Sequence, residues 1–117
     1  MKQEKIPNPN LGVRTLYNSN NVTVTKVGKI CQMHIEGKSV SGSAKGWTDV
    51  ITDLPNNARP SNSACFFLMF DNAWDGTTDA PAIVVQIRSD GSVKVYLTTN
   101  RLSISLKGDA TYIGATG

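Results

Sequence analysis

The sequence has little histidine and cysteine, the side chains on which metal sites and nucleophilic catalysis often depend. It contains one histidine and two cysteines, and no pair of cysteines has the Cys-x-x-Cys spacing. This set does not make a structural zinc site. No serine stands in a Gly-x-Ser-x-Gly motif, the position of the nucleophile in α/β-hydrolases. We therefore expect no metal, no cofactor and no enzymatic activity.

An excess of one charge and long apolar segments are also missing. The 12 basic and 9 acidic residues are scattered along the chain, and no basic run alternates with aromatic residues. We therefore expect no nucleic-acid partner. No apolar run approaches the ~20 residues that a membrane-spanning helix needs, so we expect no membrane insertion. No apolar stretch follows the first lysines, so we expect no signal peptide and synthesis in a cytoplasm.

The sequence does contain many short β-type runs separated by polar turns. Its 117 residues suffice for one compact domain with one core. Residues 1–10 are polar and contain two prolines, which predicts a linker or arm. Residues 11–117 are then expected to form a single domain.

Alternation of β-branched and polar residues predicts most of the strands. Residues 22–27 and 30–36 flank the turn Gly28-Lys29, and Asp90-Gly91 marks a second hairpin turn. Strands are expected at residues 11–17, 22–27, 30–36, 64–70, 81–88, 93–97, 102–106 and 110–113, with residues 39–44 as an edge strand or a loop. The predicted fold is all-β, an antiparallel β-sandwich or jelly-roll of about eight short strands.

Three features inside these runs carry expectations of their own. Residues 64–70 are the most apolar run of the chain and are expected to be a strand buried on both faces. Cys31 and Cys65 lie in apolar runs and are expected to be small buried side chains. A disulfide between them stays open. His34 occupies a polar position of its strand and is expected on the surface.

The stretch 46–61 has no helical periodicity and separates two groups of strands. We expect it to be a rigid crossing between them, because proline donates no backbone hydrogen bond and ends a ladder. The residues expected to hold the fold together here are Trp47, Leu54, Pro55 and Pro60. Trp47 in particular is expected to be buried, so that Trp47→Ala costs about 3–5 kcal/mol.

The loop that follows residue 70 is the candidate ligand site. Its tryptophan stands among short acids and amides, which is the combination that a saccharide site needs: a ring face for the sugar ring and oxygens for its hydroxyls. The candidate ligand-binding residues are Trp74, Asp71, Asn72, Asp75 and Arg101. The alternative is that Trp74 caps one end of the core and the aspartates form turns.

A calcium loop fits this segment less well. Acids occupy its first, fifth and ninth places and a glycine its sixth, but Ala73 and Ala82 stand at the third and twelfth places. Two expected oxygen ligands are therefore missing, and no flanking helices are predicted.

The order of motifs along the chain resembles a known family. The motif residues are Gly46-Trp47, Leu54-Pro55 and Arg59-Pro60-Ser61. They are similar to a signature in the C-terminal domains of bacteriophage and prophage tail fibre, baseplate and receptor-binding proteins. The resemblance covers roughly residues 16–114. It implies a homotrimeric β-sandwich head on a fibre, made without a signal peptide and carried in the virion tail.

Four functional interpretations follow. The first, implied by the resemblance, is a non-enzymatic receptor-binding head that recognises a host cell-surface saccharide or protein. The second is a structural trimerisation or capping module that contacts other tail or fibre proteins and has no ligand of its own. The third is a fragment of a depolymerase, and the fourth is a host-encoded surface adhesin with the same fold.

Overall fold

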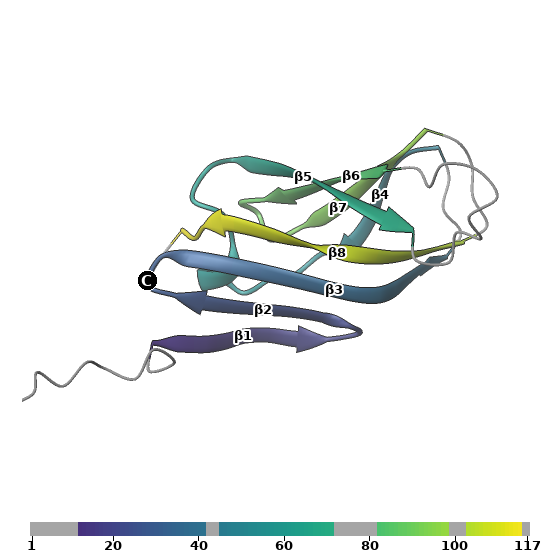
Figure 1. Cartoon of the computed structure of the whole chain (residues 1–117). Coiled ribbons are helices and arrows are strands. Elements are labelled where there is room, and N and C mark those ends of the chain that lie inside the picture. Colours follow the sequence, from purple (N-terminus) through teal and green to yellow (C-terminus); the bar gives the residue numbers. More distant parts are fainter. Residues whose placement is uncertain (1–11, 42–44, 72–81, 99–102, 116–117) are drawn as a thin grey trace, which may run out of the picture.

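The chain folds almost entirely into β-strands, as the alternation of its side chains predicts (Figure 1). The computed structural model describes residues 12–41, 45–71, 82–98 and 103–115. The strands are β1 (Val13–Ser19), β2 (Val22–Val27), β3 (Ile30–Ser41), β4 (Gly46–Ile51), β5 (Ala64–Asp71), β6 (Ala82–Arg88), β7 (Val93–Leu97) and β8 (Ser103–Ile113). Within these ranges one helical turn is present, the 3-10 element η1 (Asn56–Ala58). The predicted linker, residues 1–10, lies outside the described residues.

All eight strands belong to one antiparallel sheet. Their order is β1-β2-β3-β8-β5-β6-β7-β4, so β8 is inserted between two strands that are distant from it in sequence. The predicted all-β antiparallel fold of about eight strands is confirmed. The expected sandwich or jelly-roll is not confirmed, because the strands form one curled sheet, a half-barrel, and not two separate sheets (Figure 1).

A short seam joins the two halves of this sheet. β5 pairs with β8 at two positions, Phe70 with Lys107 and Asp71 with Leu106. One residue further along β8, Met69 packs so closely on Gly108 that a Cβ there would lie 2.5 Å from its Cγ. The glycine therefore allows β5 to approach β8, and the seam holds β5-β6-β7-β4 to β1-β2-β3-β8.

The core lies on the inner face of the curl. Along most of the strands alternate residues point inward, because successive side chains of a strand point to opposite faces of a sheet. The buried apolar side chains are Val22, Val24, Cys31, Met33, Ile35, Val40, Ile51, Leu54, Ala58, Met69, Ile83, Val85, Ile87, Val93, Val95, Leu97, Ile104, Leu106, Ala110 and Tyr112. They come from both halves of the sheet and form one cluster.

The segment after β4 closes one end of the half-barrel. Leu54 is fully buried, and its backbone N–H donates to the carbonyl of Gly91 over 2.9 Å. Pro55 is half-buried and precedes η1, and Pro60 is buried and bridges to Gly114. The structural role of these three residues stays a prediction.

Two side chains from the sheet reach this segment. The fully buried Lys26 donates from Nζ to the carbonyl of Asn57 over 2.8 Å. The hydroxyl of Tyr112 donates to the carbonyl of Ala58 over 2.7 Å. Burial raises the pKa of this phenol, because ionisation in an apolar environment is unfavourable. Both hydrogen bonds satisfy carbonyls of η1 that the short helical turn leaves without an intrahelical partner.

Two expectations for the stretch 46–61 are wrong. Its first residues are not part of a crossing but form the edge strand β4, which pairs with β7. Trp47 is not a core residue either, since 48% of its surface is exposed. It lies opposite Tyr96 on the outer face of the sheet. The bulge between Asp49 and Ile51 reverses the alternation of inward and outward side chains, so Trp47 points outward although Ile51, four residues later, points inward.

The expectation that residues 64–70 are buried on both faces is also wrong. Cys65, Phe67 and Met69 point inward, whereas Phe66, Leu68 and Phe70 are 60%, 62% and 53% exposed. A curled sheet covers one face of each strand, and no described element covers the other face of β5. The run is therefore apolar on both sides of the pleat while only one side is covered.

Candidate functional site

Of the predicted ligand loop, the described residues include the first, Asp71. Asp71 is buried, and its carboxylate accepts a hydrogen bond from the backbone N–H of Ser105 over 3.0 Å. That contact joins β5 to β8. Asn72, Trp74, Asp75 and Arg101 lie outside the described residues, so the ligand site that they would form with Asp71 stays a prediction.

The register of β5-β6-β7-β4 places an apolar row across the outer face of this half of the sheet. Residues directly opposite one another share a face. From β5 to β4 the row consists of Leu68, Val84, Tyr96 and Trp47. Phe66 and Phe70 stand two residues before and after Leu68 on the same face of β5.

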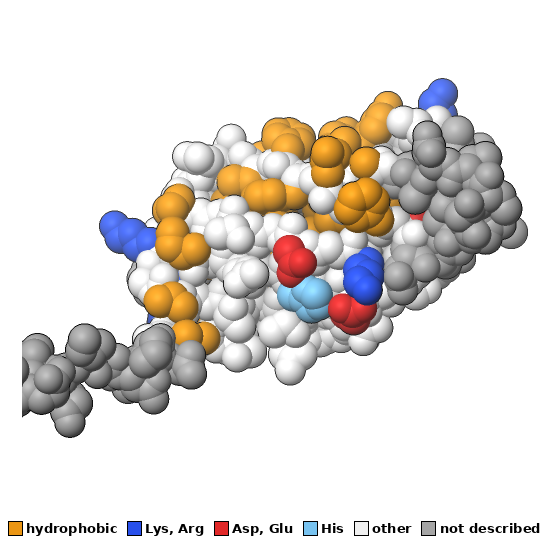
Figure 2. Space-filling model, viewed as in Figure 1, with side chains coloured by type: hydrophobic (Ala, Val, Ile, Leu, Met, Phe, Trp, Pro, Cys, Tyr) orange, Lys and Arg blue, Asp and Glu red, His pale blue; other side chains and the backbone are white. Residues whose placement is uncertain are grey.

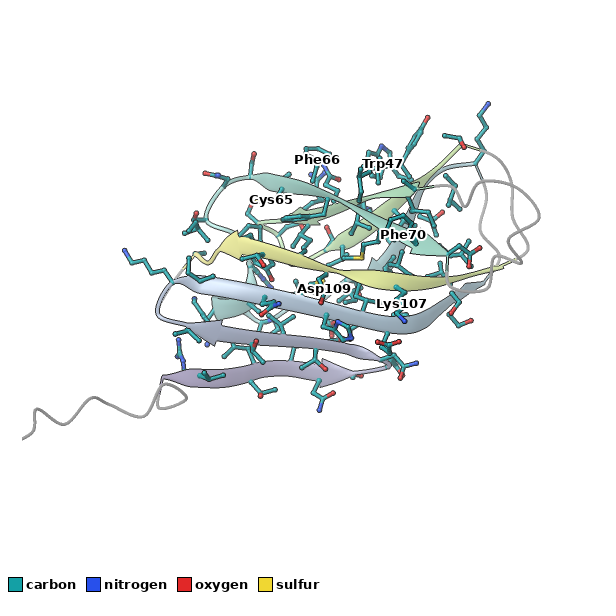
Figure 3. All side chains as sticks on the ribbon, in the orientation of Figure 1. Trp47, Cys65, Phe66, Phe70, Lys107 and Asp109 are labelled. Atoms are coloured by element: carbon teal, nitrogen blue, oxygen red, sulfur yellow. The ribbon has the colours of Figure 1, made fainter. Side chains whose placement is uncertain are left out.

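These six residues, which we call the apolar face, form one group on the surface. Figure 2 shows apolar side chains gathered over this half of the molecule, and Figure 3 shows Trp47, Phe66 and Phe70 projecting outward from it. Trp47 and Tyr96 make an edge-to-face contact, with 5.1 Å between ring centroids and 62° between ring planes. Trp47 and Tyr96 therefore contact each other on a surface that no described strand covers.

Charged pairs border the apolar face on two sides. In the row that contains Phe66, Lys94 Nζ lies 2.5 Å from Asp49 Oδ1. Beside Phe70, Lys107 Nζ lies 3.1 Å from Glu36 Oε2. An apolar centre with a polar border is the usual composition of a protein–protein interface.

The edges of the sheet are less suited to pairing with another chain. β1 and β4 are the two edge strands. Each contains a register shift, between Thr15 and Tyr17 in β1 and between Asp49 and Ile51 in β4. Bulges of this kind twist an edge away from a partner strand. Association of this chain is therefore expected to use a face of the sheet and not an edge.

His34 is the centre of a polar cluster on the outer face of β3 and β8. Its Nδ1 lies 2.6 Å from Asp109 Oδ1 and its Nε2 lies 2.9 Å from Glu36 Oε1. These two hydrogen bonds, the one to Asp109 first, raise the pKa of His34. Hydrogen bonds to Lys107 and then to His34 lower the pKa of Glu36. The cluster is exposed, and the described residues contain no group of three or more side chains that could hold a metal ion.

Cys31 does not have the environment of a catalytic nucleophile. Cys31 and Cys65 are free thiols, Cys31 fully buried and Cys65 half-buried. Burial raises the pKa of Cys31, which keeps it in the unreactive thiol form. The expectation of buried cysteines is met in full for Cys31 and in part for Cys65.

An open polar pocket of about 280 Å³ lies at the turn between β1 and β2. It is lined by Asn20, Asn21, Gly37, Lys38 and Ser39. The two asparagines adopt φ values of 50° and 67°, which the tight turn requires. The side chain of Asn21 donates to the carbonyl of Gly37 over 3.2 Å, so part of the lining already serves the fold.

Comparison with known proteins adds no relative. No protein-family model matches the chain, and no curated protein is significantly similar to it. Within the described residues no helix has the length and hydropathy to cross a membrane.

Sequence reasoning missed most of this face. Tyr96 alternates with the buried Val95 and Leu97, and this alternation was a usable signal that it points outward. Phe66, Leu68 and Phe70 gave no such signal, because their neighbours in β5 are equally apolar.

Proposed function

We propose that this chain is a non-enzymatic assembly and adhesion module that acts as a homotrimer in a phage tail fibre or baseplate. One observation carries the assembly part of the proposal: the apolar face, in which Val84 is partly exposed and five larger side chains are exposed, namely Trp47, Phe66, Leu68, Phe70 and Tyr96. The phage context, and with it a place in the virion tail, comes from the order of sequence motifs.

The size of this face supports association. Aromatic side chains each present roughly 150–250 Å², so at the observed exposures the face offers about 500 Å² of apolar surface. The largest apolar patch on a typical monomer is about 300–600 Å² and is often functional. A standard interface takes about 800 Å² from each partner, with an apolar core and a polar rim. The apolar face and the charged pairs beside it match that composition.

Recognition of a host surface saccharide or protein is the second part of the proposal. Its support is the sequence of the loop that continues from β5 and contains Trp74. Three copies in one head would present three such loops to the same cell surface, so weak single sites would bind together with much higher avidity.

The test of assembly is the mass of the purified chain in solution, measured by sedimentation equilibrium at tens of micromolar. We expect three times the 12.6 kDa of one chain. Leu68→Lys places a charge at the centre of the apolar face and is expected to give monomers. Asn18→Lys, an exposed position on the other half of the sheet, is the matched control and should leave the trimer intact. A monomeric parent chain would overturn this part of the proposal.

The test of adhesion is a glycan array together with binding to intact bacterial cells, both performed on the trimer. We expect the parent trimer to bind. We expect Trp74→Ala to lose this binding and to remain a trimer. Absence of binding to glycans and cells would leave the structural trimerisation module as the function. Release of sugar from bacterial envelopes would contradict the non-enzymatic proposal.

A further inference from the structure

A second apolar surface crosses the other half of the sheet. Val13 lies opposite Val27, Val27 opposite Ile30, and Ile30 opposite Ile113, so these four residues form one row across β1, β2, β3 and β8. Each of the four is between 40% and 50% exposed. Figure 2 shows apolar side chains in a line at this end of the molecule, separate from the apolar face. We call these four residues the end row.

The end row differs from everything else on the outer face of its strands. The next row inward consists of Thr15, Thr25, Gln32 and Thr111, and the row after it of Asn18, Thr23, His34 and Asp109. Both rows are polar, as expected for the solvent side of an antiparallel sheet. The four branched apolar side chains lie on neighbouring strands of the sheet and have polar rows beside them. This pattern is typical of a contact surface confined to one end of the sheet.

The two apolar surfaces span the same number of strands and carry different kinds of apolar side chain. Each spans four neighbouring strands, which at ~4.8 Å between strands is about 14 Å. The end row carries branched aliphatic side chains, and the apolar face is dominated by aromatic rings. No charged side chain belongs to either set, so their contact would leave no charge buried without a partner.

A closed ring of identical chains requires two different surfaces on each copy. In a trimer with three-fold symmetry, a surface on one copy meets another surface on the next copy, and the contact repeats until the ring closes. The described part of this chain has two apolar surfaces, one on each half of the sheet, and its two edge strands carry bulges. This is the arrangement that a ring needs.

We propose that the end row of each copy packs against the apolar face of the next copy, so that one repeated contact builds the homotrimer. This inference rests on the proposed function, and it identifies the partner of the apolar face as the end row of another copy of the same chain.

The test is complementation between two variants. Ile30→Lys disables the end row and leaves the apolar face, whereas Leu68→Lys disables the apolar face and leaves the end row. Each variant alone should be a monomer with the circular dichroism spectrum of the parent. Mixed in equal amounts, they retain one native contact between them and cannot close a ring. We therefore expect a complex of two chains, one of each kind, in sedimentation at the concentration where the parent is fully trimeric.

The outcomes separate the two proposals. If Ile30→Lys still forms a trimer while Leu68→Lys does not, the end row is not the partner, and the assembly proposal stands without it. If both variants are monomers and the mixture contains no complex of two chains, the contact is not between these two surfaces and the inference is overturned. Val27→Lys tests the same row from β2 and should repeat the result of Ile30→Lys. Asn18→Lys is again the control that keeps the trimer.

Discussion

The ring of Trp47 meets the ring of Tyr96 edge to face on the outer surface of the sheet, 5.1 Å between centroids. The two residues are direct cross-strand partners on β4 and β7. Tyr96 in turn lies opposite Val84, and Val84 opposite Leu68, so the aromatic pair is the outer end of the apolar row. Trp47 therefore belongs to the exposed apolar face and not to the core.

Replacement of Trp47 by alanine should cost little folding stability. An aromatic pair of this kind contributes about 0.5–1.5 kcal/mol, and Trp47 has about half of its surface in water. Leu54→Ala, at a fully buried position, should cost about 2–5 kcal/mol. Urea denaturation of both variants in a Leu68→Lys background measures folding without association. An equal loss for Trp47→Ala and Leu54→Ala would place Trp47 in the core.

Strand positions were predictable because they depend on local alternation. Residues 22–27 and 93–97 alternate cleanly, and β2 and β7 occupy those residues. The single curled sheet was not predictable, since it depends on β8 lying between β3 and β5. Alternation shows which side of a strand is apolar but does not show which strand lies beside it.

The candidate site was harder to predict for a related reason. A strand that is apolar on both sides is explained equally well by two buried faces or by one buried face and one that binds another protein. Nothing in residues 64–70 separates these alternatives. Asp71 shows a further difficulty, because an acid next to a loop indicates a ligand residue, and the sequence does not show that its carboxylate also accepts a hydrogen bond from β8.

The close contact of Met69 with Gly108 predicts that Gly108→Ala destabilises the protein. A Cβ at residue 108 would lie 2.5 Å from Met69 Cγ and 2.9 Å from its Cβ. Overpacking of this kind costs about 1–3 kcal/mol. A double-mutant cycle with Met69→Ala is the measurement, because the alanine removes Cγ, the closer of these two atoms. The loss caused by Gly108→Ala should be smaller in that background. Additive effects of the two substitutions would mean that the residues do not contact each other.

Stability should fall with rising pH through the titration of His34. Its pKa in the folded protein is raised above the ordinary value of 6.5 by the hydrogen bonds to Asp109 and Glu36. Its contribution is therefore fully present below pH 6.5 and is lost as the pH rises through the pKa of the folded state. The change is expected to be small, because the cluster is exposed and its ion pairs are screened by water.

Melting temperatures of the parent and of His34→Gln, measured from about pH 6 to about pH 9, give the comparison. The parent should lose stability over this range relative to the variant, and added salt should reduce the difference. A parent curve parallel to that of His34→Gln would show that the imidazolium makes no stabilising contact. NMR titration of the histidine side chain measures the raised pKa directly.

The hydrogen bond from Tyr112 to η1 predicts a loss of stability in Tyr112→Phe. The hydroxyl donates to the carbonyl of Ala58 over 2.7 Å at a buried position. Phenylalanine keeps the ring, including its packing against Phe67, but leaves this carbonyl without a donor. An unsatisfied buried acceptor costs about 1–3 kcal/mol.

Tyr96→Phe is the matched control for this substitution, since Tyr96 lies on the outer face and is partly exposed. Loss of the Tyr96 hydroxyl should change the free energy of unfolding by less than about 0.5 kcal/mol. Urea denaturation of both variants in the Leu68→Lys background separates the two positions. Tyr112 holds β8 to the segment that closes the half-barrel, so hydrogen exchange at residues 54–60 should become faster in Tyr112→Phe and stay unchanged in Tyr96→Phe. Equal exchange in the two variants would mean that this hydrogen bond does not hold η1 in place.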